Sequence, residues 1–162
     1  MKNNDKTNVM RILDQKKINY EAYYYPVDES QLDGRHVADS LNEDYADVFK
    51  TLVCVAPSKK YYVFVVNIID ELDLKACARA VKEKSVEMIA VKDIEGVTGG
   101  YVRGGTSPIG MKKLYKTVID NKAKDKSFIF VSGGKRGTQV KLSPLDLAKL
   151  INASFEDLRR DE

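Results

Sequence analysis

The sequence has few of the residues that carry nucleophilic or metal chemistry in many enzymes. Its 162 residues include one histidine, His36, and two cysteines, Cys54 and Cys77. The cysteines have apolar or small neighbours, which excludes a disulfide scaffold and favours reduced thiols in a cytoplasmic protein. No Cys/His cluster has the spacing of zinc ligands, and proline follows Ser107, so the nucleophile-elbow pattern is absent too. We therefore expect no metal, no cofactor and no convincing nucleophile of the protein's own.

Long hydrophobic runs are also missing. No apolar run approaches the roughly 18 residues that cross a bilayer, and the start, MKNNDKTNV, lacks the apolar core of a signal peptide. We therefore expect a cytoplasmic protein with no membrane partner. Hydrophobic residues make up 43% and charged residues 31% of the chain, which fits one globular domain over residues 1–162.

Acidic residues are absent from two stretches, 96–119 and 126–145, which hold eight basic residues between them. Because the chain has 27 basic and 24 acidic residues in all, the remainder carries 19 basic and 24 acidic residues. Eight of the ten glycines lie in segments 99–110 and 132–137 of these stretches. Positive charge on glycine-rich backbone favours a site for an anionic partner. Two solvated loops with chance charge are the alternative.

The hydrophobic pattern predicts strands in the middle of the chain and helices around them. β-Branched and aromatic residues flank the turn Pro57-Ser58-Lys59-Lys60, which indicates an antiparallel hairpin. Ser143 is a typical N-cap for a final helix, and Asp5 or Thr7 is a suitable N-cap for the first. The result is an α/β (α+β) fold. The expected helices cover 5–17, 35–41, 72–81, 91–97 and 144–151, and the expected strands cover 19–25, 48–56, 61–68, 86–90, 101–102, 117–120, 127–131 and 139–142.

Lys50, in the first strand of the hairpin, is the first candidate site residue. Side chains alternate along a strand, so Lys50 shares a face with Leu52 and Cys54. Removing water from an ammonium group on an apolar face is costly unless a partner compensates. Lys50 therefore indicates a cation in a pocket, placed to bind a carbonyl, phosphate or carboxylate. Alternatively, it lies near the strand's end and reaches solvent on its alkyl stem.

The two glycine-rich loops are the other candidate binding elements. The first, GGYVRGGTSPIG at 99–110, allows sharp turns that bring main-chain N–H groups close to an oxyanion or sugar hydroxyl. Thr106 and Ser107 add hydroxyl groups to it. The second, SGGKRG at 132–137, lacks the spacing of a phosphate loop, which excludes a nucleotide hydrolase of that kind.

Three consecutive tyrosines, Tyr23, Tyr24 and Tyr25, could stack on nucleic-acid bases. Strand alternation places Tyr23 and Tyr25 on one face and Tyr24 on the other. At least two of them are expected to be ordinary strand residues with apolar contacts.

Together these segments resemble the YbaK family of aminoacyl-tRNA deacylases, relatives of the prolyl-tRNA synthetase editing domain. The matching pieces run in family order across nearly the whole chain, and they are VFKTL at 48–52, LDLK at 72–75, GGYVRGGTSPIGMKK from Gly99, SGGKRG from Ser132 and the helix over 142–151. The resemblance implies a mixed, mostly antiparallel, barrel-like sheet with helices outside. It also implies trans-editing, the hydrolysis of cysteine wrongly esterified to tRNA(Pro), with the substrate's own thiol attacking its ester.

Carried over to this sequence, the family pattern also implies site residues. Lys50 would anchor the substrate near the 3′ end of the tRNA, and Tyr25 would line the pocket. Residues 104–108 match the family's G-x-x-x-P loop, whose amides would bind the aminoacyl-adenosine. The catalytic set is Lys50, Gly104, Gly105, Ser107 and Pro108; the substrate-binding set is Tyr25, Thr106, Gly133, Gly134 and Gln139; the inferred tRNA-binding set is Arg103, Lys112, Lys113, Lys135 and Arg136.

One position departs from the family pattern. Relatives often have an acidic residue where this chain has Gln139, whose side-chain carbonyl could bind the substrate amine only as a neutral acceptor. A deacylase for another small aminoacyl-tRNA, such as Ala-tRNA(Pro), is therefore the second hypothesis. A non-catalytic module that binds tRNA or a synthetase is the third, since it would also fit basic loops without a nucleophile. The family further suggests prolyl-tRNA synthetase as a partner.

Overall fold

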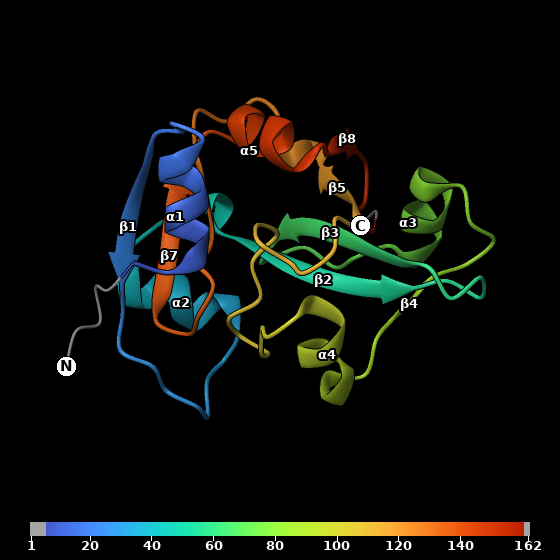
Figure 1. The fold of residues 1–162 in the computed structure, drawn as a ribbon, viewed down its shortest axis with the longest axis horizontal. Helices are drawn as coiled ribbons and strands as arrows, with labels where there is room; N and C mark the ends of the chain where they lie inside the picture. Colours follow the sequence, from blue (N-terminus) through green and yellow to red (C-terminus); the bar gives the residue numbers. More distant parts are fainter. Residues whose placement is uncertain (1–5, 161–162) are drawn as a thin grey trace.

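The computed structural model describes residues 6–160, and Figure 1 shows its helices around two sheets. The helices are α1 (Asn8–Gln15), α2 (Gly34–Leu41), α3 (Leu74–Val81), α4 (Ile94–Thr98) and α5 (Pro144–Ile151), with 3-10 turns η1 (Tyr45–Asp47), η2 (Val91–Asp93) and η3 (Asn121–Ala123). The strands are β1 (Tyr20–Tyr24), β2 (Phe49–Val55), β3 (Tyr61–Asn67), β4 (Glu87–Met88), β5 (Lys116–Asp120), β6 (Ile129–Ser132), β7 (Thr138–Leu142) and β8 (Ser154–Glu156). Within residues 6–160, no helix is both long and apolar enough to cross a membrane.

The strands form a three-stranded sheet, β1-β7-β6, and a five-stranded sheet, β4-β2-β3-β5-β8. Four strand pairs are antiparallel, and β5 pairs in parallel with β3 and with β8. A single bridge between Val48 and Phe130 joins the sheets. The mixed α/β class is confirmed. The described strands do not close into the expected barrel-like sheet, because β1 ends one sheet and β8 ends the other without pairing to each other.

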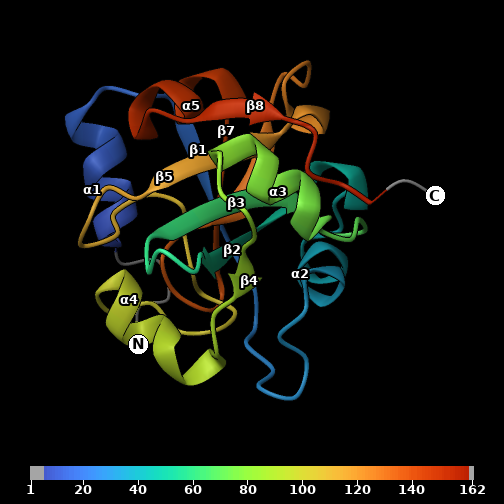
Figure 2. The same ribbon diagram turned by 90° about the vertical axis from the view of Figure 1, so that its right-hand side faces the viewer.

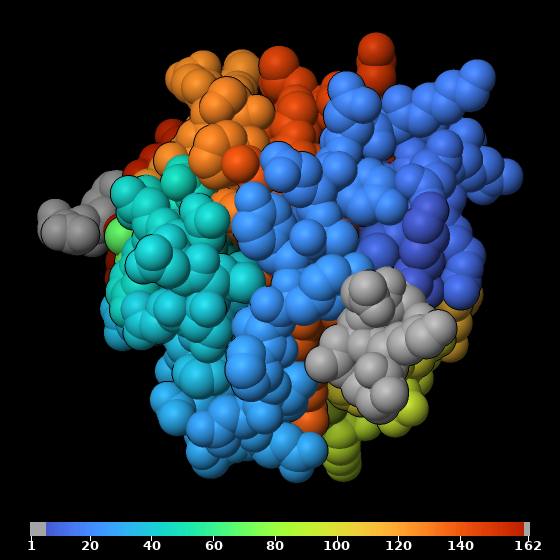
Figure 3. Space-filling view, turned by 90° about the vertical axis from the view of Figure 1, so that its left-hand side faces the viewer, coloured from blue at the N-terminus to red at the C-terminus, as the bar shows by residue number. Residues whose placement is uncertain are grey.

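Three apolar clusters fill the space around the sheets. α3 packs on one face of the five-stranded sheet, around Cys54, Phe64 and Cys77. α1 and α5 share the largest cluster with the opposite face and with the inner face of the three-stranded sheet. α2 covers the outer face of the three-stranded sheet, against Phe130. Figure 3 views the molecule from the side of β1 and α2, and the first third of the chain makes up most of the surface seen there.

The tyrosine run follows the predicted alternation. Tyr23 and Tyr25 pack with the cluster under α2, whereas Tyr24 packs with the largest cluster. The ring of Tyr23 meets that of Phe130 edge-on at 5.1 Å between centroids, which is a favourable aromatic geometry. The interpretation as strand residues with apolar contacts therefore holds for Tyr23 and Tyr24.

Side-chain caps start the helices where the sequence places them. The Thr7 hydroxyl accepts a hydrogen bond from Met10 N at 3.3 Å, whereas the alternative cap, Asp5, lies outside the described residues. The Ser143 hydroxyl accepts from Asp146 N at 3.2 Å, with Pro144 as first helical residue. Both are the expected N-cap arrangement, which satisfies an N–H group that the helix itself leaves free.

One local prediction is wrong, and one strand was not predicted. Residues 101–102 form no strand, because Tyr101 is tied into a loop: its main-chain N–H donates to Thr98 Oγ1 (3.0 Å) and its hydroxyl to the Ile109 carbonyl. β8 was not expected, because three residues are too few for a strand pattern to emerge. Its pairing with β5 across Val118, Ile119 and Asp120 defines it instead.

Candidate functional site

A cavity of about 450 Å³ lies at the free edge of β2, a volume typical of small-molecule sites. Figure 2 shows α2 and α4 on either side of this edge. Both helices contribute to the walls, together with the loop after α4 and the loop after β3. The predicted site residues that line the cavity are Lys50, Arg103, Gly104, Thr106 and Gln139, and lining residues that the sequence analysis did not select include Arg35, Thr51, Asp70, Glu71 and Ser132.

The β2 edge is open because β4 pairs only with Cys54 and Val55. Val48 O accepts a hydrogen bond from Ile68 N of the β3 side at 3.1 Å. In an antiparallel ladder, the main-chain N–H and C=O groups of alternate residues point to opposite sides of the strand. Because the Val48 carbonyl points toward β3, the main-chain groups of Thr51 point away from β3. The first half of β2 therefore presents main-chain polar groups on its outer side, along with side chains from both faces of the strand.

Lys50 is half-buried and lines this cavity. Among residues 6–160 its ammonium group has no carboxylate within ion-pair distance. Burial lowers the pKa of Lys50 from its ordinary value; the field of Asp70 opposes the shift and that of Arg35 adds to it. A cation that has lost part of its water and has no fixed partner is suited to bind a ligand's anionic or carbonyl oxygen.

The structure brings the two glycine-rich loops into contact. A Cβ atom at Gly105 would lie 2.9 Å from Arg136 N, so only glycine allows this approach without a shift of backbone. Arg136 Nε in turn donates to the Arg103 carbonyl at 2.8 Å. These contacts place Gly104 and Thr106 against the cavity, on the wall that faces β2.

Three other predicted site residues of the glycine-rich loops are buried and do not line the cavity. Ser107 and Pro108 are buried and lie outside the cavity lining. Ser107 Oγ accepts from Ile109 N at 3.2 Å, which closes a local turn. Gly133 is also buried, where a Cβ would lie 2.6 Å from Thr138 Cγ2. These residues shape the loops rather than contact the cavity.

Tyr25, Gly134 and the outlying cations also lie outside the lining. Tyr25 N donates to Gly137 O at 3.0 Å, which ties the end of β1 to the β6–β7 turn. Gly134 lies in that turn with φ +104°, and its N–H donates to Ser132 Oγ. Lys112, Lys113 and Lys135 are exposed and without ion pairs among the described residues.

Two buried polar atoms of the cavity wall have no partner in the described part of the protein. They are Gln139 Oε1 and Thr51 Oγ1. Gln139 is only 5% exposed, and a buried acceptor without a hydrogen bond is costly. Both atoms therefore suit a bound ligand with hydrogen-bond donors, such as an amine or hydroxyl. Thr51 and Ser132 could have been found from sequence, because both lie inside the motif blocks.

The cavity lining contains no histidine and no cysteine among the described residues. Its hydroxyl groups lack an adjacent base: Thr106 Oγ1 donates to the Val102 carbonyl, and Ser132 Oγ accepts from Gly134 N. Within residues 6–160 no group of three or more His, Cys, Asp or Glu side chains is arranged to bind a metal ion. What the cavity offers is charge, positioning and hydrogen bonds.

Comparison with known proteins bears on the family of this chain. A family model described as the aminoacyl-tRNA editing domain matches residues 31–150. A curated protein of Enterococcus faecalis (strain ATCC 700802 / V583), named "Putative Cys-tRNA(Pro)/Cys-tRNA(Cys) deacylase EbsC", is 42% identical over 161 residues, which cover 99% of this chain and 98% of the relative.

Solved structures show the same fold at low sequence identity. One, described as "a putative trans-editing enzyme for prolyl tRNA synthetase", has a TM-score of 0.82 and 20% identity over 97% of this chain and all of the other. A second, described as "hypothetical protein APE2540", has a TM-score of 0.86 and 16% identity over 95% of this chain and all of the other. The resemblance inferred from the motif blocks is thereby confirmed, and the chain belongs to the aminoacyl-tRNA editing domain family.

Proposed function

We propose that this protein is a trans-editing hydrolase that removes cysteine from mischarged tRNA(Pro). The observation that carries the proposal is Lys50, a half-buried cation with no ion pair within residues 6–160. Its cavity also presents Gly104, Thr106 and Gln139 Oε1, an acceptor with no partner in the same part of the chain. The name of the 42% identical relative supports the reaction and the substrate. Residues 1–162 would act as one editing domain.

The reaction needs a second site because cysteine and proline are similar in size. In a small apolar pocket the binding free energies of two such substrates differ by only about 1–3 kcal/mol. A separate cavity that destroys the wrong ester can supply the missing discrimination. Free amino acids are loaded onto tRNA in the cytoplasm, where we place this protein.

The substrate's thiol is the proposed nucleophile, since no described cavity residue pairs a nucleophile with a base. Its sulfur bonds to the ester carbonyl carbon, and the bond from that carbon to the ribose oxygen breaks. The ribose oxygen takes up the proton that the thiol has lost, and water then opens the cyclic thioester to free cysteine. Lys50 and loop amides near Gly104 would stabilise the negative charge that develops on oxygen.

The test measures loss of labelled amino acid from Cys-tRNA(Pro), Ala-tRNA(Pro) and Pro-tRNA(Pro) under identical conditions. We expect rapid loss of cysteine and no acceleration for proline, because proline has no thiol. Hydrolysis of Pro-tRNA(Pro) at a similar rate would contradict an editing role.

Ala-tRNA(Pro) is the second candidate substrate, because Gln139 gives the cavity a neutral acceptor at a position where relatives often have an acid. Preferential loss of alanine would favour this substrate and would exclude thiol attack. Tight binding of tRNA without any ester loss would instead indicate a non-catalytic module.

The exposed lysines of the glycine-rich loops, Lys112, Lys113 and Lys135, are proposed tRNA phosphate contacts. Replacing all three with alanine should weaken tRNA binding and reduce the slope of log Kd against log salt concentration by roughly 2 to 3, because each of the three neutralised phosphates contributes about 0.7 to 0.9. Arg136 is left in place because it bonds to the Arg103 carbonyl. Filter binding from about 50 to 200 mM salt measures the slope.

The matched control replaces three exposed lysines on other surfaces, Lys75, Lys124 and Lys149, with alanine. It should leave the slope nearly unchanged. Equal effects of the two triple variants would show that the loop lysines are ordinary surface. Prolyl-tRNA synthetase is a proposed partner that could deliver the tRNA, testable by co-elution of the two purified proteins.

A further inference from the structure

The cavity contains three basic side chains, Lys50, Arg35 and Arg103. Among the described residues none of the three is in an ion pair. Lys50 is half-buried, whereas both arginines are exposed. The arginines therefore lie toward the mouth of the cavity, and Lys50 lies deeper.

The three carboxylates of the lining are already engaged. Asp33 caps α2 by accepting from His36 N at 2.9 Å. Asp70 pairs with Lys122 at 3.1 Å, and Glu71 pairs with Arg160 at 2.8 Å; neither cation lines the cavity. The negative charges of Asp70 and Glu71 are thus offset by cations outside the cavity, and Asp33 is held at the N-terminus of α2, while the cavity's own cations have no ion pairs among the described residues. The imbalance favours an anionic ligand.

The main chain fixes the two arginines on different walls. Arg35 is in the first turn of α2, where Gly34 lies so close to Ile68 that a Cβ would be 2.2 Å from Ile68 Cγ2. Arg103 is in a turn closed by Gly105 N to Val102 O (2.9 Å), and its carbonyl is bonded to Arg136. Packing therefore fixes the main chain at Arg35 and at Arg103, whereas both guanidinium groups remain available to a ligand.

We propose that Arg35 and Arg103 together bind the phosphate that joins the terminal adenosine of the tRNA to the preceding nucleotide, with Lys50 left for the ester. This inference rests on the proposed function. A guanidinium group forms forked, charge-assisted hydrogen bonds with phosphate oxygens. Two guanidinium groups that hold this phosphate at the mouth would determine how far the 3′ end of the tRNA extends into the cavity. The field of Arg35 adds to the lowering of the Lys50 pKa, which agrees with the two cations lying in one cavity.

The test compares adenosine with adenosine 5′-monophosphate, whose phosphate occupies the 5′ position of the terminal nucleoside. Calorimetric titration of the unmodified protein should give a monophosphate affinity roughly 10- to 100-fold above that of adenosine. In the double variant Arg35→Gln, Arg103→Gln the two affinities should become nearly equal. The control is Arg79→Gln, an exposed arginine on α3, which should keep the preference. No preference in the unmodified protein, no detectable monophosphate binding, or a preference retained by the double variant would overturn the proposal.

A kinetic measurement separates this proposal from the proposed function. On Cys-tRNA(Pro) the double variant should raise KM by a similar factor while kcat changes by less than about threefold, because the phosphate is bound equally before and during the reaction. A fall in kcat with unchanged KM would also overturn it. If no aminoacyl-tRNA is hydrolysed but the monophosphate preference depends on both arginines, the phosphate site stands and the editing function fails.

Discussion

Replacing Lys50 with methionine is expected to lower kcat/KM for deacylation of Cys-tRNA(Pro) by about 100- to 1,000-fold, the usual cost of removing one preorganised stabilising group. Lys50→Ala should have the same effect. Both variants should remain folded, because Lys50 forms no ion pair among the described residues and burial already disfavours its charged form. Methionine keeps the length of the side chain and removes the charge.

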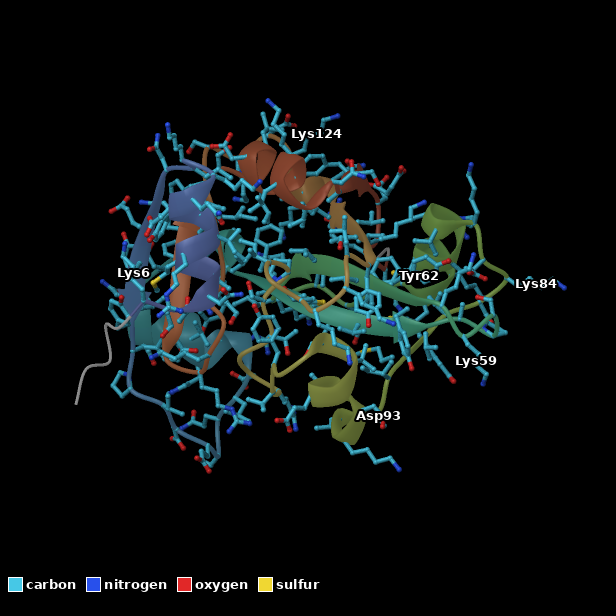
Figure 4. The ribbon with its side chains drawn as sticks, viewed as in Figure 1. Lys6, Lys59, Tyr62, Lys84, Asp93 and Lys124 are labelled. Atoms are coloured by element: carbon cyan, nitrogen blue, oxygen red, sulfur yellow. The ribbon has the colours of Figure 1, made fainter. Side chains whose placement is uncertain are left out.

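Single-turnover deacylation and thermal unfolding measured on the same preparations check both parts of this expectation. The matched control is Lys124→Met, an exposed lysine that Figure 4 shows at the side of the molecule away from α4. It should leave kcat/KM unchanged. Full activity of Lys50→Met would remove Lys50 from the site, and unfolding of that variant would show that the lysine is structural.

The second large effect concerns the carboxylate of Asp120, whose side chain is fully buried. Its oxygens accept hydrogen bonds from Leu158 N (2.8 Å) and Lys122 N (3.0 Å), and Arg159 Nε lies 2.7 Å away. Asp120→Ala leaves the buried Leu158 N–H and the partly buried Lys122 N–H without this acceptor, and Arg159 keeps only the exposed carboxylate of Asp157. We expect it to lower the free energy of unfolding by about 3 kcal/mol, or the Tm by roughly 6–12 °C.

Asp157→Ala is the matched control, because Asp157 is an exposed carboxylate 3.8 Å from the same Arg159. Exposed pairs contribute little, so its effect should stay within about 1 kcal/mol. Equal losses in urea titrations of the two variants would contradict the role given to Asp120.

Asp120 also affects the cavity through the C-terminal segment. Leu158 O accepts from Asp73 N at 2.7 Å, and Arg160 N donates to Glu71 O at 2.9 Å. These bonds join the segment that Asp120 anchors to the loop that carries Asp70 and Glu71. Under conditions where Asp120→Ala is still folded, we expect its KM for tRNA to change more than that of Asp157→Ala.

The local features of this protein follow from its sequence. The β2–β3 hairpin, the caps at Thr7 and Ser143, and the position of Lys50 on the face of Leu52 and Cys54 are all as predicted. Each depends on residues a few positions apart, since turn residues, capping hydroxyls and strand alternation act over short distances. The motif blocks added the family, because several of them occur together and in order.

Tertiary structure alone decided which of these features meet. The sequence pattern predicted two glycine-rich loops, but only folding placed Gly105 against Arg136 and turned Ser107 into the interior. Arg35 lies outside both acid-free stretches, so no local signal marked it as part of the cavity. The ion pair of Asp70 with Lys122 joins residues 52 positions apart and that of Glu71 with Arg160 joins residues 89 apart. Contacts of this range depend on how the strands are ordered and which edges stay open, and the order of strands is a property of the whole chain rather than of any segment.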